Sequence, residues 1–253
     1  LLNCKEKKDF TTFAAMLITI DIGNTLIKIG LFEGHRLVKH ETFTSQAVEK
    51  ALDIYSDWSN YSTRSIGIAS GAIDANWPKS IKWLTIDSPW PIKISYKTPE
   101  SIGLDRLLFA SAHWLEHRQD LITVVAGSCI TYNIVKNDAF IGGAISPGWA
   151  MRYKAMHAFT EALPHLVKSS ETHVVGASTE ESMWSGVDTA LPLEMSAMIH
   201  AMQKETGIKL VIICGGDAKA LSNHLKSYIF APSNYELYAL QRIDEYFKSQ
   251  SIK

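Results

Sequence analysis

Alternating apolar and polar positions dominate the first part of the chain. Residues 17–21 form a short apolar run, and residues 27–33 and 36–44 alternate, with glycine and asparagine at the connections. Period-two alternation is typical of half-buried strands, and glycine and asparagine favour turns. The pattern predicts an antiparallel meander of three strands. A helix over 46–58 and a buried strand over 66–70 should follow.

The middle of the chain predicts two helices around one strand. A helix is expected over 74–84, shortened at its start by Pro78, because proline disrupts a helix interior. A strand is expected at 92–96. Leucine and alanine then repeat at helical spacing and predict a helix over 104–117.

The order of elements then repeats. A second set of three strands is followed by helices that alternate with strands, and this repetition predicts a duplicated α/β unit with a nucleotide cleft between the copies. We place the two domains at 16–118 and 119–253, after a flexible extension at 1–15. The expected elements of the second copy are strands at 121–125, 130–135, 139–145, 210–214 and 227–230, and helices at 149–163, 179–204 with a break near Leu191 and Pro192, and 235–248.

Charge and composition exclude several classes of protein. The 25 basic and 26 acidic residues give a formal net charge of -1, which lacks the basic footprint of nucleic-acid binding. No apolar run reaches the roughly 18 residues of a membrane helix. The three cysteines lie far apart, which disfavours a disulfide framework and a zinc cage and favours a reducing, cytoplasmic location.

The first glycine turn carries candidate chemistry. Asp21 ends a strand, and Gly23 and Asn24 then make a tight turn before Thr25 and Lys28. Backbone N–H groups, a hydroxyl and an amine can converge there on an oxyanion, and the acid suits a magnesium ion. The alternative is an ordinary hairpin in which glycine and asparagine only permit positive φ.

Two later glycine turns occupy similar places. Residues 126–131 follow the first strand of the second copy, and residues 215–217 follow a late buried strand. Glycine turns at the carboxyl ends of strands can line one nucleotide cleft. By composition alone they are ordinary loops.

An Asp-Arg pair lies where a loop enters the helix over 104–117. Asp105 and Arg106 follow Gly103 and Leu104. The simple interpretation is an acid that favours the helix N-terminus, worth about 0.3–1 kcal/mol, beside a solvated arginine.

Together these motifs resemble the type III pantothenate kinase family, in order and spacing, from Met16 to nearly the end. The resemblance implies the fold of the acetate and sugar kinase, chaperone and actin superfamily, with two ribonuclease H-like domains. It also implies a homodimer that transfers the γ-phosphate of ATP to pantothenate, the first step of coenzyme A synthesis. The matching motifs are DIGNTLIK at 21–28, Tyr96 followed by GLDR at 103–106, AGSCIT at 126–131, GGAISPG at 142–148, TEALP at 160–164 and CGGDA at 214–218.

The resemblance also implies roles for individual residues. Asp105 would accept the proton of the pantothenate hydroxyl, Arg106 would offer a bidentate fork to its carboxylate, and Asp21 would face Mg²⁺. The residues implied to bind ATP are Asp21, Gly23, Asn24, Thr25, Lys28, Gly127, Ser128, Thr131, Gly215 and Gly216; those implied to bind pantothenate are Tyr96, Gly103, Leu104, Asp105, Arg106 and Thr179.

Two positions depart from the family pattern. Val125 stands where the family has the aspartate that binds a monovalent cation, K⁺ or NH₄⁺, and Asn133 replaces the aspartate that ends the second phosphate turn. Valine cannot coordinate a hard cation, so we expect weakened or altered cation dependence. The alternative function is an ATP-binding accessory or regulatory dimer of the same fold with weakened catalysis.

A zinc pattern competes for one helix. His113, Glu116 and His117 fit HxxEH, which places two histidines on one helical face. The same helix starts with GLDR, the three residues lie opposite its leucine stripe, and no third ligand is evident. We therefore favour a solvated helix face over a zinc site.

Overall fold

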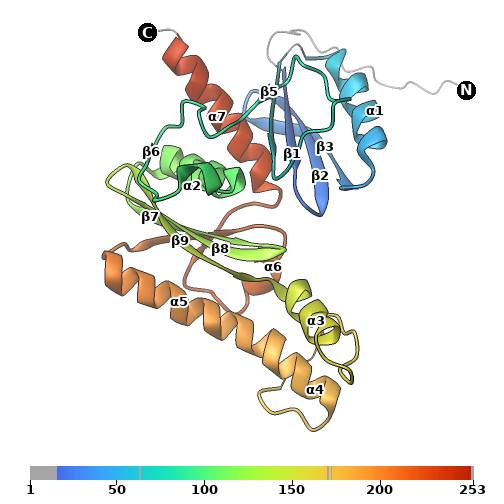
Figure 1. The fold of residues 1–253 in the computed structure, drawn as a ribbon. Coiled ribbons are helices and arrows are strands. Elements are labelled where there is room, and N and C mark those ends of the chain that lie inside the picture. Colours follow the sequence, from blue (N-terminus) through green and yellow to red (C-terminus); the bar gives the residue numbers. More distant parts are fainter. Residues whose placement is uncertain (1–15, 63, 170, 172, 252–253) are drawn as a thin grey trace, which may run out of the picture. The chain divides into compact units, whose positions relative to one another are not determined.

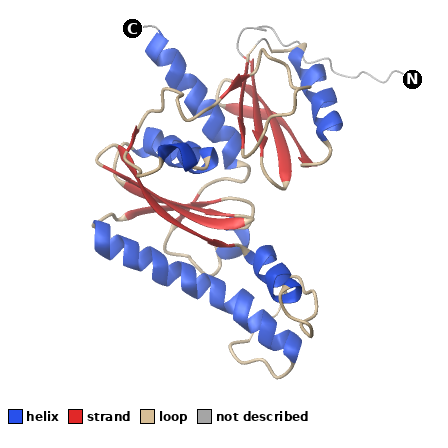
Figure 2. Ribbon diagram, in the orientation of Figure 1, coloured by secondary structure: helices blue, strands red, loops and turns tan. Residues whose placement is uncertain are grey.

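The computed structural model describes residues 16–62, 64–169, 171 and 173–251 and has a mixed α/β fold with two sheets (Figures 1 and 2). Contacts divide the chain into two compact units, one up to Thr85 and one from Ile86 onward. The extension expected at 1–15 lies outside the described residues. The expected α/β fold is confirmed.

The first unit is built on a five-stranded sheet of order β3-β2-β1-β4-β5. The first three strands are antiparallel neighbours, as the alternation predicted, and the last two run parallel to β1. The side chains of Tyr55 and Trp58 on helix α1 are buried against this sheet. The elements are β1 (Met16–Ile22), β2 (Leu26–Glu33), β3 (Arg36–Thr44), α1 (Val48–Ser59), β4 (Ser65–Ala69) and β5 (Lys82–Trp83).

The helix expected over 74–84 was wrong. These residues form turns and the short strand β5. Trp77 and Ile81 are buried in the core, and the Trp77 ring meets the rings of Tyr55 and Trp83 edge to face at 6.1 and 5.9 Å. Burial of this aromatic group, together with Pro78 in the segment, prevails over helical spacing.

The second unit contains a six-stranded sheet of order β11-β10-β7-β8-β9-β6. Strands β7, β8 and β9 form the predicted antiparallel meander, and β10 and β11 again run parallel beside β7. The strands are β6 (Lys93–Ile94), β7 (Leu121–Ala126), β8 (Cys129–Lys136), β9 (Ala139–Pro147), β10 (Leu210–Cys214) and β11 (Ile229–Phe230).

The two sheets share one strand order. In each, a three-stranded meander is followed by two parallel strands on the side of its first strand, and β6 is an addition at the far edge of the second sheet. The registers also correspond: Asp21 pairs with Lys28 next to the β1–β2 turn, and Val125 pairs with Thr131 next to the β7–β8 turn. This correspondence confirms the duplication that the element order predicted.

Helices cover both faces of the second sheet (Figure 2). α2 and α7 pack against each other on one face, and α5 lies along the other. Because α2 packs on α7 and the second sheet, it belongs to the second unit, whereas the sequence placed the boundary after residue 118. The helices are η2 (Pro99–Ser101), α2 (Leu104–His117), α3 (Trp149–Ala158), α4 (Thr179–Trp184), η3 (Ser185–Thr189), α5 (Ala190–Thr206), α6 (Ala218–Leu221) and α7 (Tyr235–Ser251).

The long helix expected over 179–204 is interrupted, but slightly earlier than predicted. The irregular part is the π-helical turn η3 at Ser185–Thr189, and Pro192 lies in the first turn of α5. Proline has no N–H to donate and disrupts the regular helical hydrogen bonds of the preceding turn, which agrees with a π-helical turn just before it.

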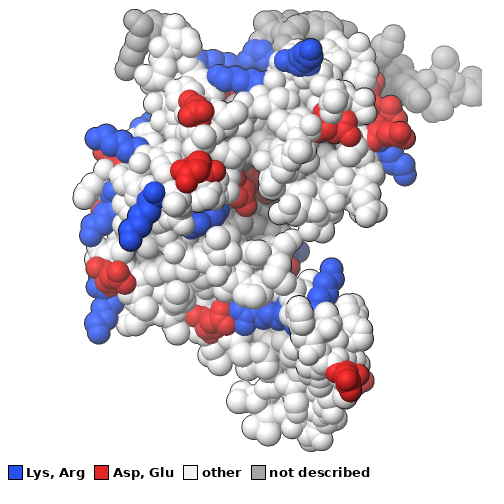
Figure 3. All heavy atoms as spheres, in the orientation of Figure 1, with Lys and Arg blue, Asp and Glu red and all other residues white. Residues whose placement is uncertain are grey.

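Surface charge is mixed. On the face drawn in Figure 3, Lys and Arg side chains are interspersed with Asp and Glu side chains, as expected from a formal net charge of -1. None of the described helices has the length and apolarity needed to cross a bilayer.

Candidate functional site

The first glycine turn connects β1 to β2. Asp21 is half-buried, and its register partner across the hairpin is Lys28. The Gly23 N–H donates to the Leu26 carbonyl at 2.9 Å, which closes the turn. Neither Gly23 nor Asn24 has a positive φ. Positive φ therefore does not explain these residues, although a Cβ on Gly23 would come within 3.2 Å of the Leu26 carbonyl oxygen, so the tight turn itself favours glycine there.

The later glycine turns meet within the second unit. The Asp217 N–H donates to the carbonyl of Ala126 at 3.0 Å, and a Cβ on Gly215, where φ is +100°, would overlap that same carbonyl oxygen. The Gly148 N–H donates to the Ser128 carbonyl at 3.1 Å. Backbone hydrogen bonds thus join three segments into one assembly: the β7–β8 turn, the start of α3 and the turn after β10. The sequence predicted that the glycine turns line one nucleotide cleft; the turns at 126–131 and 215–217 do meet, and the cleft stays a prediction.

This assembly presents open backbone. A Cβ built on Gly127 or on Gly216 would meet no atom within 4 Å, and Ser128 and Gly216 are exposed. Packing therefore does not demand glycine at these two positions. Glycine is also used where a ligand must approach the backbone closely, and this is the remaining explanation for the two positions.

Two charged residues near this assembly escaped sequence analysis. Trp149 is the first residue of α3, and the Lys168 Nζ lies 3.6 Å from the centre of its ring. Burial raises the pKa of Asp217, and the nearby Lys168 charge partly offsets the rise. Lys168 lies in the loop between α3 and α4, where no local pattern marks it. Asp217 was quoted in the CGGDA motif but assigned no role.

A second group of predicted residues gathers around Phe140 of β9. The Tyr96 ring meets the Phe140 ring at 5.9 Å, and the Arg106 Cζ lies 5.5 Å from the centre of the same ring. Gly142 has φ of +126°, and a Cβ there would approach the Tyr96 ring to 3.3 Å. Tyr96 and the GLDR motif, predicted to share one substrate site, therefore lie around one buried aromatic residue. Phe140 carried no sequence signal beyond its place in an apolar strand.

The GLDR motif forms the entry to α2. Gly103 is the N-cap, and a Cβ on it would lie 2.7 Å from a carboxylate oxygen of Asp105. Asp105 is half-buried in the first turn, where the helix dipole favours an acid. Arg106, however, is only 5% exposed. The explanation of a solvated arginine beside a helix-terminal acid was therefore wrong for Arg106.

Arg106 is bound to β8. Its Nε donates to Asn133 Oδ1 at 2.7 Å, and a terminal nitrogen donates to the Tyr132 carbonyl at 3.3 Å. Asn133 in turn donates to the Thr131 hydroxyl at 3.1 Å. Thr131, implied by the resemblance to bind ATP, is therefore linked to Arg106 on the pantothenate side of the predicted site.

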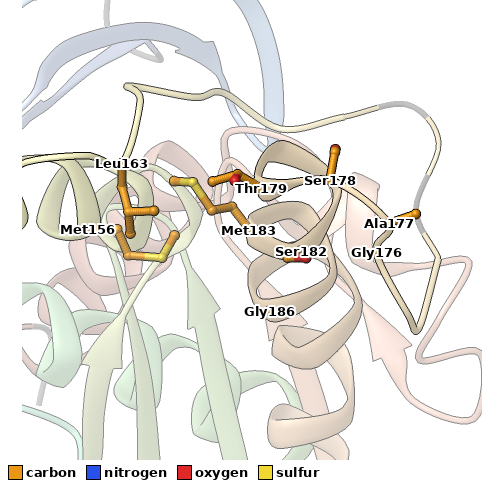
Figure 4. Close-up of a pocket in the computed structure, with 9 residues that line it drawn as sticks. All are labelled: Met156, Leu163, Gly176, Ala177, Ser178, Thr179, Ser182, Met183 and Gly186. Carbon is orange, nitrogen blue, oxygen red and sulfur yellow. The ribbon is translucent and has the colours of Figure 1, made fainter.

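Thr179 lies apart from this group. It starts α4 and lines a pocket of about 660 Å³ with Ser178, Ser182, Met183 and Met156 among others (Figure 4). Ser178 caps the helix by accepting the Glu181 N–H at 3.1 Å. α4 continues through η3 into α5, which lies on the face of the sheet opposite α2, and α4 lies at the end of α5 beyond the sheet (Figure 1). One chain therefore does not bring Thr179 together with Tyr96 and Arg106.

Among the HxxEH residues, Glu116 is exposed and His117 half-buried, but His113 is buried, so the interpretation of a solvated face was wrong for His113. This side chain is 1% exposed and stacks on Tyr235 of α7 at 4.2 Å with 4° between the rings. Burial lowers its pKa to about 3. Glu116 accepts hydrogen bonds from the Tyr235 hydroxyl at 3.2 Å and from Arg242 at 3.1 Å. Potential ligand atoms of His113, Glu116 and His117 lie within 4.8 Å of one another, but the packing of α2 on α7 already accounts for the positions of His113 and Glu116.

Comparisons with known proteins agree with these motifs. A family model described as type III pantothenate kinase matches residues 17–204. Proteins named type III pantothenate kinase from Flavobacterium johnsoniae and Phocaeicola vulgatus are 32% and 35% identical to the chain, and each alignment covers 91% of the chain and 98% of the relative. A relative of the same name from Christiangramia forsetii is 32% identical over 93% of the chain and its own full length.

Solved structures show the same fold at lower identity. A Campylobacter jejuni protein described as of the Baf family of transcriptional activators has a TM-score of 0.60 at 19% identity, over 93% of this chain and 100% of its own. The activator of 2-hydroxyisocaproyl-CoA dehydratase from Clostridium difficile, with bound ADPNP, has a TM-score of 0.51 at 15% identity, over 94% and 98%. The superfamily fold implied by the motifs is confirmed. The family model and the full-length relatives together establish that the chain belongs to the type III pantothenate kinase family.

Proposed function

We propose that the chain phosphorylates the primary hydroxyl of pantothenate with ATP, giving 4'-phosphopantothenate in the first step of coenzyme A synthesis. Family membership over more than nine-tenths of the chain is the observation that carries this function. The gathering of Tyr96, Asp105 and Arg106 in the second unit supports it. The accessory-dimer alternative has no support in the comparisons. A cytoplasmic location belongs to the same proposal.

Asp105 is the proposed proton acceptor. It lies in the first turn of a fourteen-residue helix, next to an arginine that is fixed to the sheet. Phosphoryl transfer through a loose transition state demands mainly alignment and charge neutralisation. A half-buried carboxylate with a fixed neighbour suits that demand, since it orients the hydroxyl and accepts its proton as the new ester bond forms.

The glycine turns are the proposed ATP contacts. In the first unit, Asp21 and Lys28 are neighbours across the hairpin, so an acid and a cation lie together at the strand ends. In the second unit, the assembly around Gly127 offers open backbone. Kinases of this fold use ATP with a divalent metal ion, which neutralises phosphate charge. We assign Mg²⁺ to this chain, with the Asp21 carboxylate as its hard oxygen donor.

The monovalent cation site of the family is not retained in this proposal. Val125 occupies the register position that corresponds to Asp21, and its side chain has no oxygen to offer. Hard cations require oxygen ligands. We therefore propose turnover that does not depend on K⁺ or NH₄⁺.

A homodimer would complete the site. If Thr179 contacts pantothenate, as the resemblance implies, we infer that it comes from a second copy, because α4, which carries it, lies away from α2, which carries Arg106 (Figure 1). Apolar side chains that a partner subunit could cover are exposed on the same part of the second unit: Ile145, Met151, Phe159, Val167, Val174, Val175 and Leu193.

ADP release tests the proposal directly. Initial rates measured with ATP and Mg²⁺ should rise from a low background when pantothenate is added, and mass spectrometry should find the phosphorylated product. ATP hydrolysis that is indifferent to pantothenate would contradict the kinase assignment.

A further inference from the structure

Asn133 connects the central sheet of the second unit to helix α2. The side chain lies in β8 and is 0% exposed. Side chains alternate along a strand, so Tyr132 packs in the core beneath α5 while Asn133 faces α2. Because an arginine Nε can only donate, the Asn133 oxygen must be the atom that accepts it. The amide nitrogen is then free to donate to Thr131, as observed.

Arg106 is held from three directions. The Asn133 oxygen binds Nε, the Tyr132 carbonyl binds a terminal nitrogen, and the Phe140 ring lies 5.5 Å from Cζ. Within the part of the chain that the structure describes, no carboxylate forms an ion pair with Arg106. The position of this guanidinium therefore depends on neutral partners, and Asn133 makes the shortest contact among them.

This arrangement fixes the start of α2. Arg106 directly follows Asp105 in the first turn, so anchoring one side chain restricts both the rotation and the axial position of the other. A displacement of about 1 Å can cost roughly 100-fold in rate when reacting groups must be aligned. We propose that Asn133 is a positioning residue: it acts through Arg106 to hold Asp105 in place for phosphoryl transfer, and this inference rests on the proposed kinase function.

The location sets Asn133 apart from the tip of the second phosphate turn. In the family pattern the aspartate at this position closes the second phosphate turn, which would assign Asn133 to the nucleotide. Ser128 of that turn precedes Asn133 by five residues, about 16 Å along an extended strand. The Asn133 oxygen accepts from Arg106 of α2, and its amide nitrogen donates to Thr131 of the same strand. Replacement of aspartate by asparagine retains the acceptor for Arg106, so catalysis should survive this departure.

Steady-state kinetics of Asn133→Leu and Asn133→Asp test the role. Leucine has a similar volume but no acceptor, so kcat should fall at least about tenfold while the KM for ATP stays within about twofold of the native value. Aspartate retains an acceptor, so kcat should stay within about threefold of the native enzyme. Asn223→Ala, at an exposed asparagine of the same unit, is the matched control and should be unchanged.

A second variant tests the proposal independently in case Asn133→Leu does not fold. Phe140→Leu removes the ring beside the guanidinium and should reproduce the fall in kcat with an unchanged KM for ATP. Thermal unfolding is measured for each variant, and assays are run well below the transition. A rise in the KM for ATP at constant kcat would overturn the proposal, as would a native kcat in both Asn133→Leu and Phe140→Leu.

Failure of the inference is distinguishable from failure of the function. The native enzyme is assayed first in the same experiment. Absence of pantothenate-dependent turnover there would reject the kinase assignment itself. Native turnover with insensitive variants would reject only the role of Asn133.

Discussion

Asp21 and Val125 occupy the same position in the two sheets. Each is the last but one residue of the first strand of its meander, and each faces a register partner on the second strand, Lys28 or Thr131. The duplicated framework thus carries an acid in one copy and an aliphatic residue in the other. Our proposals of a magnesium contact at Asp21 and of no monovalent cation contact at Val125 both concern this position.

Omission of potassium should leave the rate nearly unchanged. Val125 offers no oxygen ligand, so K⁺ lacks a carboxylate at this position. Initial rates with KCl, NH₄Cl or an equal concentration of tetramethylammonium chloride should agree within about twofold. Val125→Asp should introduce activation by K⁺, and Val125→Ala should not. Strong activation of the native enzyme by K⁺ would contradict the inference.

Neutralising Asp105 should nearly abolish turnover. Asp105→Asn retains the size of the side chain but removes the proton acceptor, and loss of general-base catalysis typically lowers kcat by roughly 10²–10⁴-fold. The KM for ATP should change little. Glu100→Gln, an exposed acid in the preceding turn, is the matched control. Turnover of Asp105→Asn at the native rate would remove the assignment.

Complementation between two inactive variants should reveal a site shared by two subunits. Thr179→Trp should block the contact that Thr179 offers, and Asp105→Asn should remove the base. If each site takes these residues from different copies, co-expression of the two variants should restore pantothenate-dependent activity in the hybrid dimers. Each variant expressed alone sets the background. Recovery no greater than the sum of the separate activities would argue for a site within one chain.

The stability of the protein should fall below about pH 6.5 because of His113. Burial lowers the pKa of this residue to about 3 in the folded protein, whereas a histidine in an unfolded chain titrates near pH 6.5. Between these values the unfolded state binds the extra proton, so stability falls as pH decreases, by up to about 1.4 kcal/mol per pH unit. Urea unfolding from about pH 7 to 4 measures the slope.

His113→Phe should flatten this dependence. Phenylalanine retains a ring that can stack on Tyr235 but cannot be protonated. His224→Gln, at an exposed histidine, should leave the slope as it is in the native protein. Equal slopes for the native protein and His113→Phe would exclude His113 as the source.

Regular patterns predicted the parts of the fold that depend on local spacing. Both meanders and α2 follow from alternation and helical periodicity, and the glycine turns follow from turn chemistry. The segment around Trp77 was predicted wrongly because its spacing fits a helix while its large rings are buried among other aromatics. Tertiary packing decides the secondary structure of such a segment, and a short window of sequence does not contain the residues that pack against it.

Some residues of the candidate site could likewise be predicted from local sequence, and others could not. Tyr96, Asp105 and Gly127 stand in motifs, so the sequence pointed to them. The role of Asn133 could not be inferred from sequence, because its hydrogen bond to Arg106 joins positions 27 residues apart. His113 was misplaced for a similar reason: the partner that buries it, Tyr235, comes from the last helix of the chain.

The glycine contacts in the second unit also limit how this enzyme can evolve. A Cβ on Gly148 would overlap the carbonyl of Gly127, and one on Gly215 would overlap that of Ala126. Even a single methyl group at either position would push neighbouring loops apart. Substitutions in these turns must therefore spare the two positions and fall on exposed neighbours such as Ser128.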